Sequence, residues 1–207
     1  MLVHEIRKTL PFEDNELETI LAFHAITGCD SVSYFCGHTK KTAWDVFLKH
    51  YHLLMSLGKS KDVTEQTAVD AETFMCHVYN FPNNPRCDQV RVTLFCRGKT
   101  QEMMPPTSDS LRFHINRANY QTLIWRNAHV PVPEIHDPTN SGGWQMDDGQ
   151  LKPVLKSLPP IPMVCKDIVS CGCKKGCIKN CACKKSRVMC TPACKCFDSE
   201  HPCKNKE

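Results

Sequence analysis

No run of apolar residues in this sequence approaches the roughly 18–20 residues that a helix needs to cross a bilayer. The first residues, MLVHEIRKTLPFEDNELE, contain no apolar segment of the signal-peptide kind, and acidic residues come too early for a transit peptide. Phosphate-binding loops, dinucleotide-binding fingerprints and a Ser/His/Asp order are also absent. We therefore expect an intracellular protein with no membrane partner, no small-molecule substrate and no catalytic activity of its own.

Cysteine is the residue that the sequence has in excess. Of its 15 cysteines, eight lie in the stretch CGCKKGCIKNCACKKSRVMCTPACKC, residues 171–196, and Cys203 follows. The cytosol and nucleus keep thiols reduced, so clustered cysteines there bind metal more often than they form disulfides, although a disulfide scaffold is the alternative. Apolar residues are few in this stretch, and metal binding must therefore supply its folding free energy.

The spacing C-x-C-x3-C-x3-C-x-C-x6-C-x3-C-x-C-x6-C allows two ways of filling zinc sites. Zinc bound by thiolates is normally four-coordinate, so nine terminal thiolates satisfy two ions and leave one thiolate over. Three ions need twelve ligand positions, which nine cysteines fill if three of them bridge two ions each. The C-x-C pairs favour three ions, because thiolates two residues apart more readily serve neighbouring ions of one cluster.

This pattern, with CKKGC and CKN at its edges, resembles the CXC domains of tesmin-type chromatin proteins. It is also similar to the related domain of the male-specific-lethal ubiquitin ligase and to the pre-SET cluster of histone methyltransferases. The resemblance covers residues 171–205 and implies a cluster of three zinc ions, together with DNA binding in the first two groups. The implied zinc ligands are Cys171, Cys173, Cys177, Cys181, Cys183, Cys190, Cys194, Cys196 and Cys203.

Two features distinguish the sequence from the tesmin-type repeats. Asn180 stands where those repeats carry a tyrosine that enters the DNA minor groove, and FDSEHP separates Cys196 from Cys203 where two residues are usual. The longer gap offers His201 as a replacement or additional ligand, although a solvated loop histidine is favoured. Cys165, six residues before the cluster, offers a tenth ligand, although a free cysteine is favoured. Because the tyrosine is missing, we expect contacts to DNA phosphates without readout of a base sequence.

Positive charge is concentrated in the cysteine-rich tail. Residues 171–207 hold nine Lys or Arg and three acidic residues, a net charge of +6, and the whole chain carries +4, so residues 1–170 sum to −2. Three Zn²⁺ and nine thiolates add −3, which leaves the tail near +3. Basic side chains that neutralise phosphates give salt-dependent DNA binding, and the candidates are Lys174, Lys175, Lys179, Lys184, Lys185, Arg187 and Lys195. In the alternatives, these side chains only balance the thiolates, or the cluster is a scaffold for protein contacts.

The rest of the chain is predicted to be a mostly α-helical body. Apolar residues recur at helical spacing over residues 14–27, 40–57, 64–79, 88–96 and 107–128. We expect the scattered cysteines to be buried thiols, namely Cys29, Cys36, Cys76, Cys87 and Cys96. We expect the three tryptophans to anchor the core or a hairpin, namely Trp44, Trp125 and Trp144.

A proline-rich linker follows the helices. Residues 129–162 hold seven of the 14 prolines, and the stretch GWQMDDGQLKPVL within them predicts a small β-hairpin that turns at Asp147-Asp148-Gly149. The predicted fold class is therefore mostly α: a helical body, a small β-hairpin in a Pro-rich linker, and an irregular zinc-cluster CXC module.

The stretch HAITGCDSVSYFCGHTKKTAWDVF near the amino terminus resembles the end of the PIN-like core of flap endonucleases and XPG-type nucleases. In that family an Asp completes an acidic metal site, and Asp30 matches it. A glycine-rich turn binds a DNA phosphate there, and Gly37, Lys40 and Lys41 match this turn, with Thr39 in place of its second glycine.

Two-metal phosphodiester hydrolysis needs several carboxylates around Mg²⁺, and the other acids of such nucleases come from strands upstream of this segment. We therefore interpret residues 1–57 as the carboxyl-terminal remnant of a nuclease-like domain without its catalytic half, and Asp30 as a helix cap. A fragment of a structure-specific nuclease is the alternative.

Nearly the whole chain also resembles a group of uncharacterised animal proteins, many of them derived from mobile elements. The resulting domain plan is a nuclease-like remnant, a helical region, a Pro-rich linker with the hairpin, and the CXC zinc-cluster domain, over residues 1–57, 58–128, 129–164 and 165–207. The predicted function is that of a zinc-binding nuclear protein that contacts DNA phosphates and has no catalytic activity.

Overall fold

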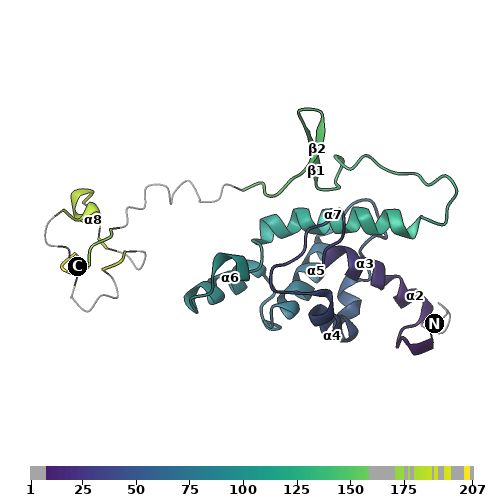
Figure 1. The fold of residues 1–207 in the computed structure, drawn as a ribbon, viewed down its shortest axis with the longest axis horizontal. Helices are drawn as coiled ribbons and strands as arrows, with labels where there is room; N and C mark the ends of the chain where they lie inside the picture. Colours follow the sequence, from purple (N-terminus) through teal and green to yellow (C-terminus); the bar gives the residue numbers. More distant parts are fainter. Residues whose placement is uncertain are drawn as a thin grey trace. The chain divides into compact units, whose positions relative to one another are not determined.

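The computed structural model describes residues 8–158, 171–174, 177, 180–187, 189–190, 194–196 and 203–205. The chain divides into two compact units, Met1–Ser157 and Leu158–Glu207 (Figure 1). The described part is mostly α-helical, with a small hairpin and a cysteine-rich cluster, which confirms the predicted fold class. None of its helices is both long and apolar enough to span a bilayer.

The first unit contains a helix in each of the predicted ranges, and the largest differences from the predicted bounds are in 14–27 and 40–57. Its described part contains α2 (Asp14–Leu17), α3 (Thr19–Ile26), α4 (Lys40–His50), α5 (Glu65–Val78), α6 (Cys87–Cys96) and α7 (Ser108–Arg126). The prediction of one continuous helix over 14–27 is wrong, because the ladder is interrupted at Glu18. There the Thr19 hydroxyl donates to the carbonyl of Glu16 at 2.5 Å, and it competes with backbone N–H groups for this acceptor. The helix predicted over 40–57 ends at His50 and passes into the 3-10 turn η1 (Tyr51–Leu54).

Threonine residues begin three of these helices. The side chains of Thr39, Thr64 and Thr107 accept hydrogen bonds from backbone N–H groups in the first turns of α4, α5 and α7. An N-terminal threonine satisfies a donor that has no partner within the helix. These capping threonines explain why the starts of α4, α5 and α7 agree with the sequence prediction to within a residue.

The core of the first unit is built where α3 packs along α7 and α5 packs against α4 and α7 (Figure 1). Phe23, Phe47 and Phe74 meet there, with ring centroids 4.6 Å apart for Phe23 and Phe47 and 6.5 Å apart for Phe23 and Phe74. Such tilted and edge-to-face pairs add to the stabilisation from apolar burial. Trp44 lies 5.4 Å from Phe23 and Trp125 packs against the same core, as predicted.

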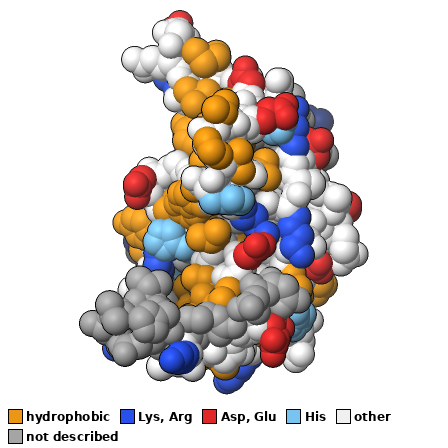
Figure 2. Space-filling view, turned by 90° about the vertical axis from the view of Figure 1, so that its right-hand side faces the viewer, with side chains coloured by type: hydrophobic (Ala, Val, Ile, Leu, Met, Phe, Trp, Pro, Cys, Tyr) orange, Lys and Arg blue, Asp and Glu red, His pale blue; other side chains and the backbone are white. Residues whose placement is uncertain are grey.

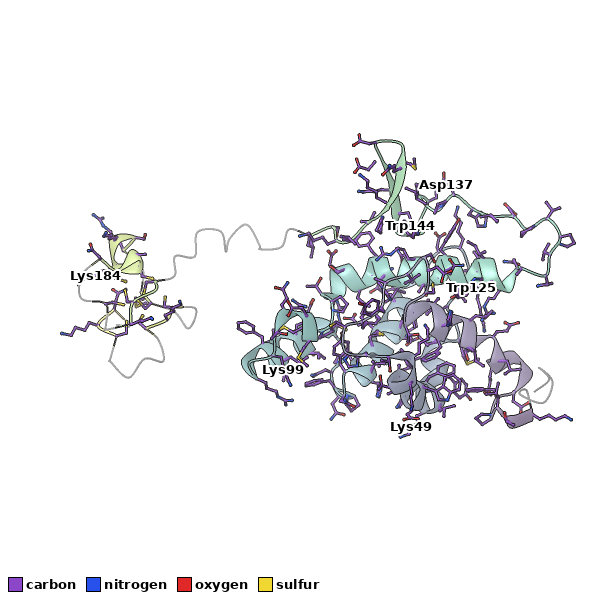
Figure 3. The ribbon with its side chains drawn as sticks, viewed as in Figure 1. Lys49, Lys99, Trp125, Asp137, Trp144 and Lys184 are labelled. Atoms are coloured by element: carbon purple, nitrogen blue, oxygen red, sulfur yellow. The ribbon has the colours of Figure 1, made fainter. Side chains whose placement is uncertain are left out.

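The predicted hairpin is present as β1 (Trp144–Asp147) and β2 (Gln150–Pro153), which pair antiparallel with Asp147 opposite Gln150. Its two loop residues, Asp148 and Gly149, have φ of 49° and 73°, the left-handed geometry that a tight hairpin turn needs. Arg117 of α7 holds the base of the hairpin. Its guanidinium donates to the carbonyls of Gly143 and Val154 and lies 6.0 Å from the ring of Trp144, a residue that Figure 3 labels.

The expectation of buried thiols holds for only part of the helical body. Cys76 and Cys87 are fully buried, and Cys29 is half-buried. The prediction is wrong for Cys36 and Cys96, which are exposed because Cys36 lies in the loop before α4 and Cys96 on the outer side of the last turn of α6.

Gly58 follows η1 in a position that no other residue type fits. It has φ of 73°, its N–H donates to the Asn119 side chain at 2.7 Å, and a Cβ placed on it would lie 2.3 Å from Cγ2 of Thr122. We expect Gly58→Ala to destabilise the protein by about 2–5 kcal/mol, through left-handed strain plus overpacking. Urea unfolding followed by tryptophan fluorescence would measure this, because all three tryptophans lie in the first unit.

Gly98 is the matched control for this substitution. It has φ of 71° but no atom lies within 4 Å of the position that a Cβ would take. Gly98→Ala should therefore cost only the strain, about 1–2 kcal/mol. Equal losses for the two variants would show that the contact with Thr122 contributes nothing.

His114 of α7 makes the stability of the first unit depend on pH. Burial lowers the pKa of this side chain to about 4, against a hydrogen bond to the carbonyl of Ile26 that favours the charged form. Between pH about 6.5 and 4 the unfolded chain takes up a proton that the folded chain does not. The free energy of unfolding of the first unit is therefore not reduced by His114 above pH about 6.5, and it is lower by roughly 2 kcal/mol at pH about 5.

Urea unfolding of the wild type and of His114→Asn at several pH values would check this expectation. The variant has no group that titrates at position 114, so its free energy of unfolding should fall less steeply as the pH is lowered. A wild-type slope identical to that of the variant would contradict the assignment to His114.

Candidate metal centre

The cysteines form the interior of the second unit. Of the nine described cysteines of this unit, seven are at most 5% exposed, and Cys173 and Cys203 are half-buried against them. Figure 3 shows their sulfur atoms gathered within this unit. The described residues between them are small, polar or charged, apart from Met189, which is exposed. Thiols therefore occupy the place that apolar side chains fill in an ordinary domain.

The distances between sulfur atoms match those of a metal–thiolate cluster. Cys177 Sγ lies 3.4 Å from Cys196 Sγ and 3.6 Å from Cys190 Sγ, and Cys171 Sγ lies 3.9 Å from Cys190 Sγ. Zinc–sulfur bonds of about 2.3 Å in a tetrahedron separate the sulfurs by about 3.8 Å, whereas a disulfide needs about 2.05 Å. No disulfide joins the described cysteines to one another.

Three groups of four cysteines each have their sulfurs within 4.8 Å of one another. The groups are Cys171, Cys177, Cys181 and Cys190; Cys171, Cys183, Cys190 and Cys194; and Cys177, Cys190, Cys196 and Cys203. The groups overlap: Cys171 and Cys177 each belong to two, and Cys190 belongs to all three. Such overlap is what bridging thiolates require, and a set of separate four-cysteine sites would not produce it.

Backbone contacts bring the ends of the unit to its middle. The N–H of Cys171 points to Cys194 Sγ at 3.5 Å, and the N–H of Lys195 donates to the carbonyl of Cys171 at 3.0 Å. Near the other end, Asn205 accepts from the N–H of Cys190 at 2.7 Å through its carbonyl, and its side-chain amide donates to Cys190 Sγ at 3.4 Å. Donors to a metal-bound sulfur stabilise its negative charge.

Asn205 is a residue that sequence reasoning did not single out as functional. Its only signal was its place in the CKN edge of the pattern, beside Cys203. A contact with Cys190, fifteen positions earlier, depends on the folded path of the chain.

The thiols differ in how readily they ionise. Cys181 lies at the start of the short helix α8 (Ala182–Lys185). The pKa of its thiol is lowered to about 6, mainly by a hydrogen bond from the backbone N–H of Lys184. Burial raises the pKa of Cys177 and raises that of Cys196 to about 12. Buried thiols so close together cannot all carry charge without a cation, and metal binding is therefore coupled to loss of their protons.

Basic side chains lie on the outside of this unit. Lys184 and Lys185 of α8, with Arg187 just after it, are exposed, as are Lys174 and Lys195 (Figure 3 labels Lys184). Asn180 is exposed and has φ of 58°. Four further residues of the sequence analysis lie outside the described residues, namely Lys175, Lys179, Cys165 and His201.

The candidate phosphate-binding turn near the amino terminus has a different role in the structure. Lys40 Nζ donates to the carbonyl of His24 at 2.7 Å, to the carbonyl of Gly28 at 2.5 Å and to the Thr27 hydroxyl at 2.9 Å. A cation there complements the carboxyl end of α3. Thr39 caps α4, and Lys41 is exposed beside it. Lys40 thus ties the start of α4 to the end of α3.

Asp30 is exposed in the loop between α3 and α4. Its prediction as a helix cap is wrong, because α4 begins ten residues later at Lys40 and its cap is Thr39. Within the described ranges, every group of three or more side chains placed to hold a metal ion consists of cysteines. No carboxylate cluster therefore surrounds Asp30 in that part of the chain.

Comparison of the chain with protein-family models, curated proteins and solved structures found no match in any of the three. A function must therefore be argued from the site itself. The dense cysteine cluster is compatible with zinc binding, because it offers the soft thiolate ligands and the sulfur spacing that tetrahedral zinc prefers.

Proposed function

We propose that the cysteine-rich unit binds three zinc ions and contacts DNA phosphates, and that the protein has no catalytic activity of its own. The observation that carries the proposal is the overlap of the three four-cysteine groups inside a unit whose charged side chains, among the described residues, are all basic and exposed. DNA contact implies a location in the nucleus.

The overlap suggests which cysteines bridge. Cys171, Cys177 and Cys190 are the residues that the groups share, and three bridging thiolates are what nine cysteines need to satisfy three four-coordinate ions. Each pair of these bridges then takes two terminal cysteines. The terminal pairs are Cys173 with Cys181, Cys183 with Cys194, and Cys196 with Cys203.

This assignment places Cys173, which lies against the cluster but in none of the three groups. The first ion would share Cys171 and Cys177 as bridges and take Cys173 in the position where Cys190 now completes the group. Cys190 would then serve the second and third ions. Each ion has two bridging and two terminal ligands.

The charge of the loaded cluster supports a role at DNA. Three Zn²⁺ with nine thiolates leave the tail near +3, whereas residues 1–170 sum to −2. On the face of the molecule in Figure 2, Lys and Arg side chains stand among Asp and Glu side chains. The tail is thus the part of the chain with an excess of positive charge, which is the electrostatic requirement for phosphate contact.

Fluorescence anisotropy with a labelled random duplex tests this proposal on the zinc-loaded full chain at several salt concentrations. The variant with Lys184, Lys185 and Arg187 all changed to Gln should bind more weakly, and its salt slope should be smaller by about 2–3, at about 0.9 per lost phosphate contact. The control changes three exposed lysines of the first unit, Lys49, Lys59 and Lys99, to Gln and should bind as the wild type does.

Absence of binding at low salt, with the zinc-loaded unit folded, would overturn the DNA assignment and leave the cluster as a scaffold for protein contacts. Mg²⁺-dependent cleavage of the duplex by the purified chain would contradict the assignment of a non-enzymatic function.

A further inference from the structure

The helical body holds a cavity that the zinc cluster does not use. Its volume is about 380 Å³. It lies among the loop before α4, the end of α5, the middle of α6, the segment around the 3-10 turn η2 (Gln101–Met103), the first half of α7 and the segment after β2. Cavities of this size hold small organic ligands, usually by an apolar wall and a few convergent polar groups. We call it the arginine cavity after Arg91 and Arg117, which line it.

The charged side chains that line the arginine cavity have one sign. Arg91 and Arg117 contribute guanidinium groups, and none of the described lining residues is an Asp or Glu. Arg117 is 5% exposed, and within the described part of the chain only backbone carbonyls, those of Gly143 and Val154, accept from it. Burial lowers the pKa of Arg117, which reflects the cost of a buried charge without a counter-ion.

Neutral hydrogen-bonding groups lie beside the two cations. His114 Nε2 donates to the carbonyl of Ile26 at 2.8 Å, so its Nδ1 accepts from the Ser33 hydroxyl at 3.4 Å. Burial raises the pKa of Tyr79, whose phenol therefore stays protonated and able to donate. Through its described lining residues, the cavity thus offers cations, hydroxyls and a neutral imidazole, without a carboxylate acceptor among them.

The remaining wall is apolar. Phe35 lies 4.7 Å from the His114 ring and 6.5 Å from the Tyr79 ring, and Met104 and Leu155 line the same cavity. A ligand that fits both parts has an apolar body and one negatively charged head. The planar guanidinium group pairs with carboxylate and phosphate oxygens through two parallel hydrogen bonds.

We propose that the arginine cavity binds a small organic oxyanion, with the carboxylate or phosphate at Arg91 and Arg117 and the apolar part against Phe35, Met104 and Leu155. The anion would compensate the buried guanidinium of Arg117, which no acidic side chain does within the described residues. This site is independent of zinc and of DNA, so either assignment stands if the other fails.

NMR titration of the ¹⁵N-labelled, zinc-loaded full chain tests the site with three probes of similar shape: phenylacetate, phenyl phosphate and the neutral phenylacetamide. We expect saturable shifts around the cavity for at least one acid, and binding of the amide that is weaker by about tenfold or more, because hydrogen bonds to a charged group are the stronger ones. Comparison of the two acids identifies the preferred head group.

Two pairs of variants locate the binding. Arg91→Gln should weaken binding of the acid about tenfold, whereas Arg112→Gln, on the exposed side of α7 where it pairs with Glu65, should leave it unchanged. Arg117 also anchors the hairpin, so Leu155→Trp is used to fill the cavity instead, with Leu151→Trp of β2 as its control.

Three results would overturn the proposal. The first is equal affinity for phenylacetate and phenylacetamide, and the second is the absence of a saturable shift with either acid. The third is an affinity for the acid that stays the same in the Arg91→Gln and Leu155→Trp variants. Retained DNA binding in these variants would show that the outcome concerns the cavity alone.

Discussion

Removal of zinc with a chelator is expected to unfold the cysteine-rich unit while the helical body stays folded. The second unit has thiols in place of an apolar core, and in the absence of a cation those thiols lose the interaction that holds them together. Structural zinc supplies about 10–16 kcal/mol of apparent binding free energy per ion in zinc-finger peptides, which exceeds the stability of most small domains. The first unit has its own core around Phe23, Phe47 and Phe74.

Two readouts separate the units in one sample. Tryptophan fluorescence reports only on the first unit, because Trp44, Trp125 and Trp144 all lie there, and it should not change on chelation. Amide signals of residues 171–205 should lose their dispersion and recover it when zinc is added back. Retention of these signals after complete removal of zinc would show that the unit folds without metal.

The bridging assignment predicts that Cys190→Ser releases more zinc than Cys203→Ser. Cys190 belongs to all three cysteine groups and bridges two ions in the proposed cluster, whereas Cys203 belongs to one group and is a terminal ligand. Loss of a bridge leaves two ions three-coordinate and also removes the sulfur that Asn205 contacts. We expect Cys190→Ser to keep one ion or none, and Cys203→Ser to keep two or three.

Native mass spectrometry of the full chain counts the ions directly. The matched control is Cys96→Ser, an exposed cysteine of α6 outside the cluster, which should keep three ions. Equal zinc content in the Cys190 and Cys203 variants would contradict the bridging assignment. Two ions in the wild type would favour the alternative in which one thiolate is left over.

The sequence by itself determined much of the helical body. Thr39, Thr64 and Thr107 cap α4, α5 and α7 through bonds within one turn, and the Asp148-Gly149 loop sets the hairpin through its own backbone angles. Such features depend on neighbours in the chain, and local sequence therefore contains them. The break between α2 and α3 was missed because apolar periodicity alone does not register the Thr19 side chain competing for a helical carbonyl.

The tertiary structure decided which side chains face one another. Nine cysteines at metal-ligand spacing predicted a cluster, but the sharing of Cys171, Cys177 and Cys190 among three groups depends on where the chain returns after each loop. In the same way, the position of Arg117 in the sequence of α7 does not reveal that it contacts Gly143 and Val154 at the base of the hairpin, 26 and 37 residues later. Contacts between distant residues are set by how the elements pack, and local composition does not specify that packing.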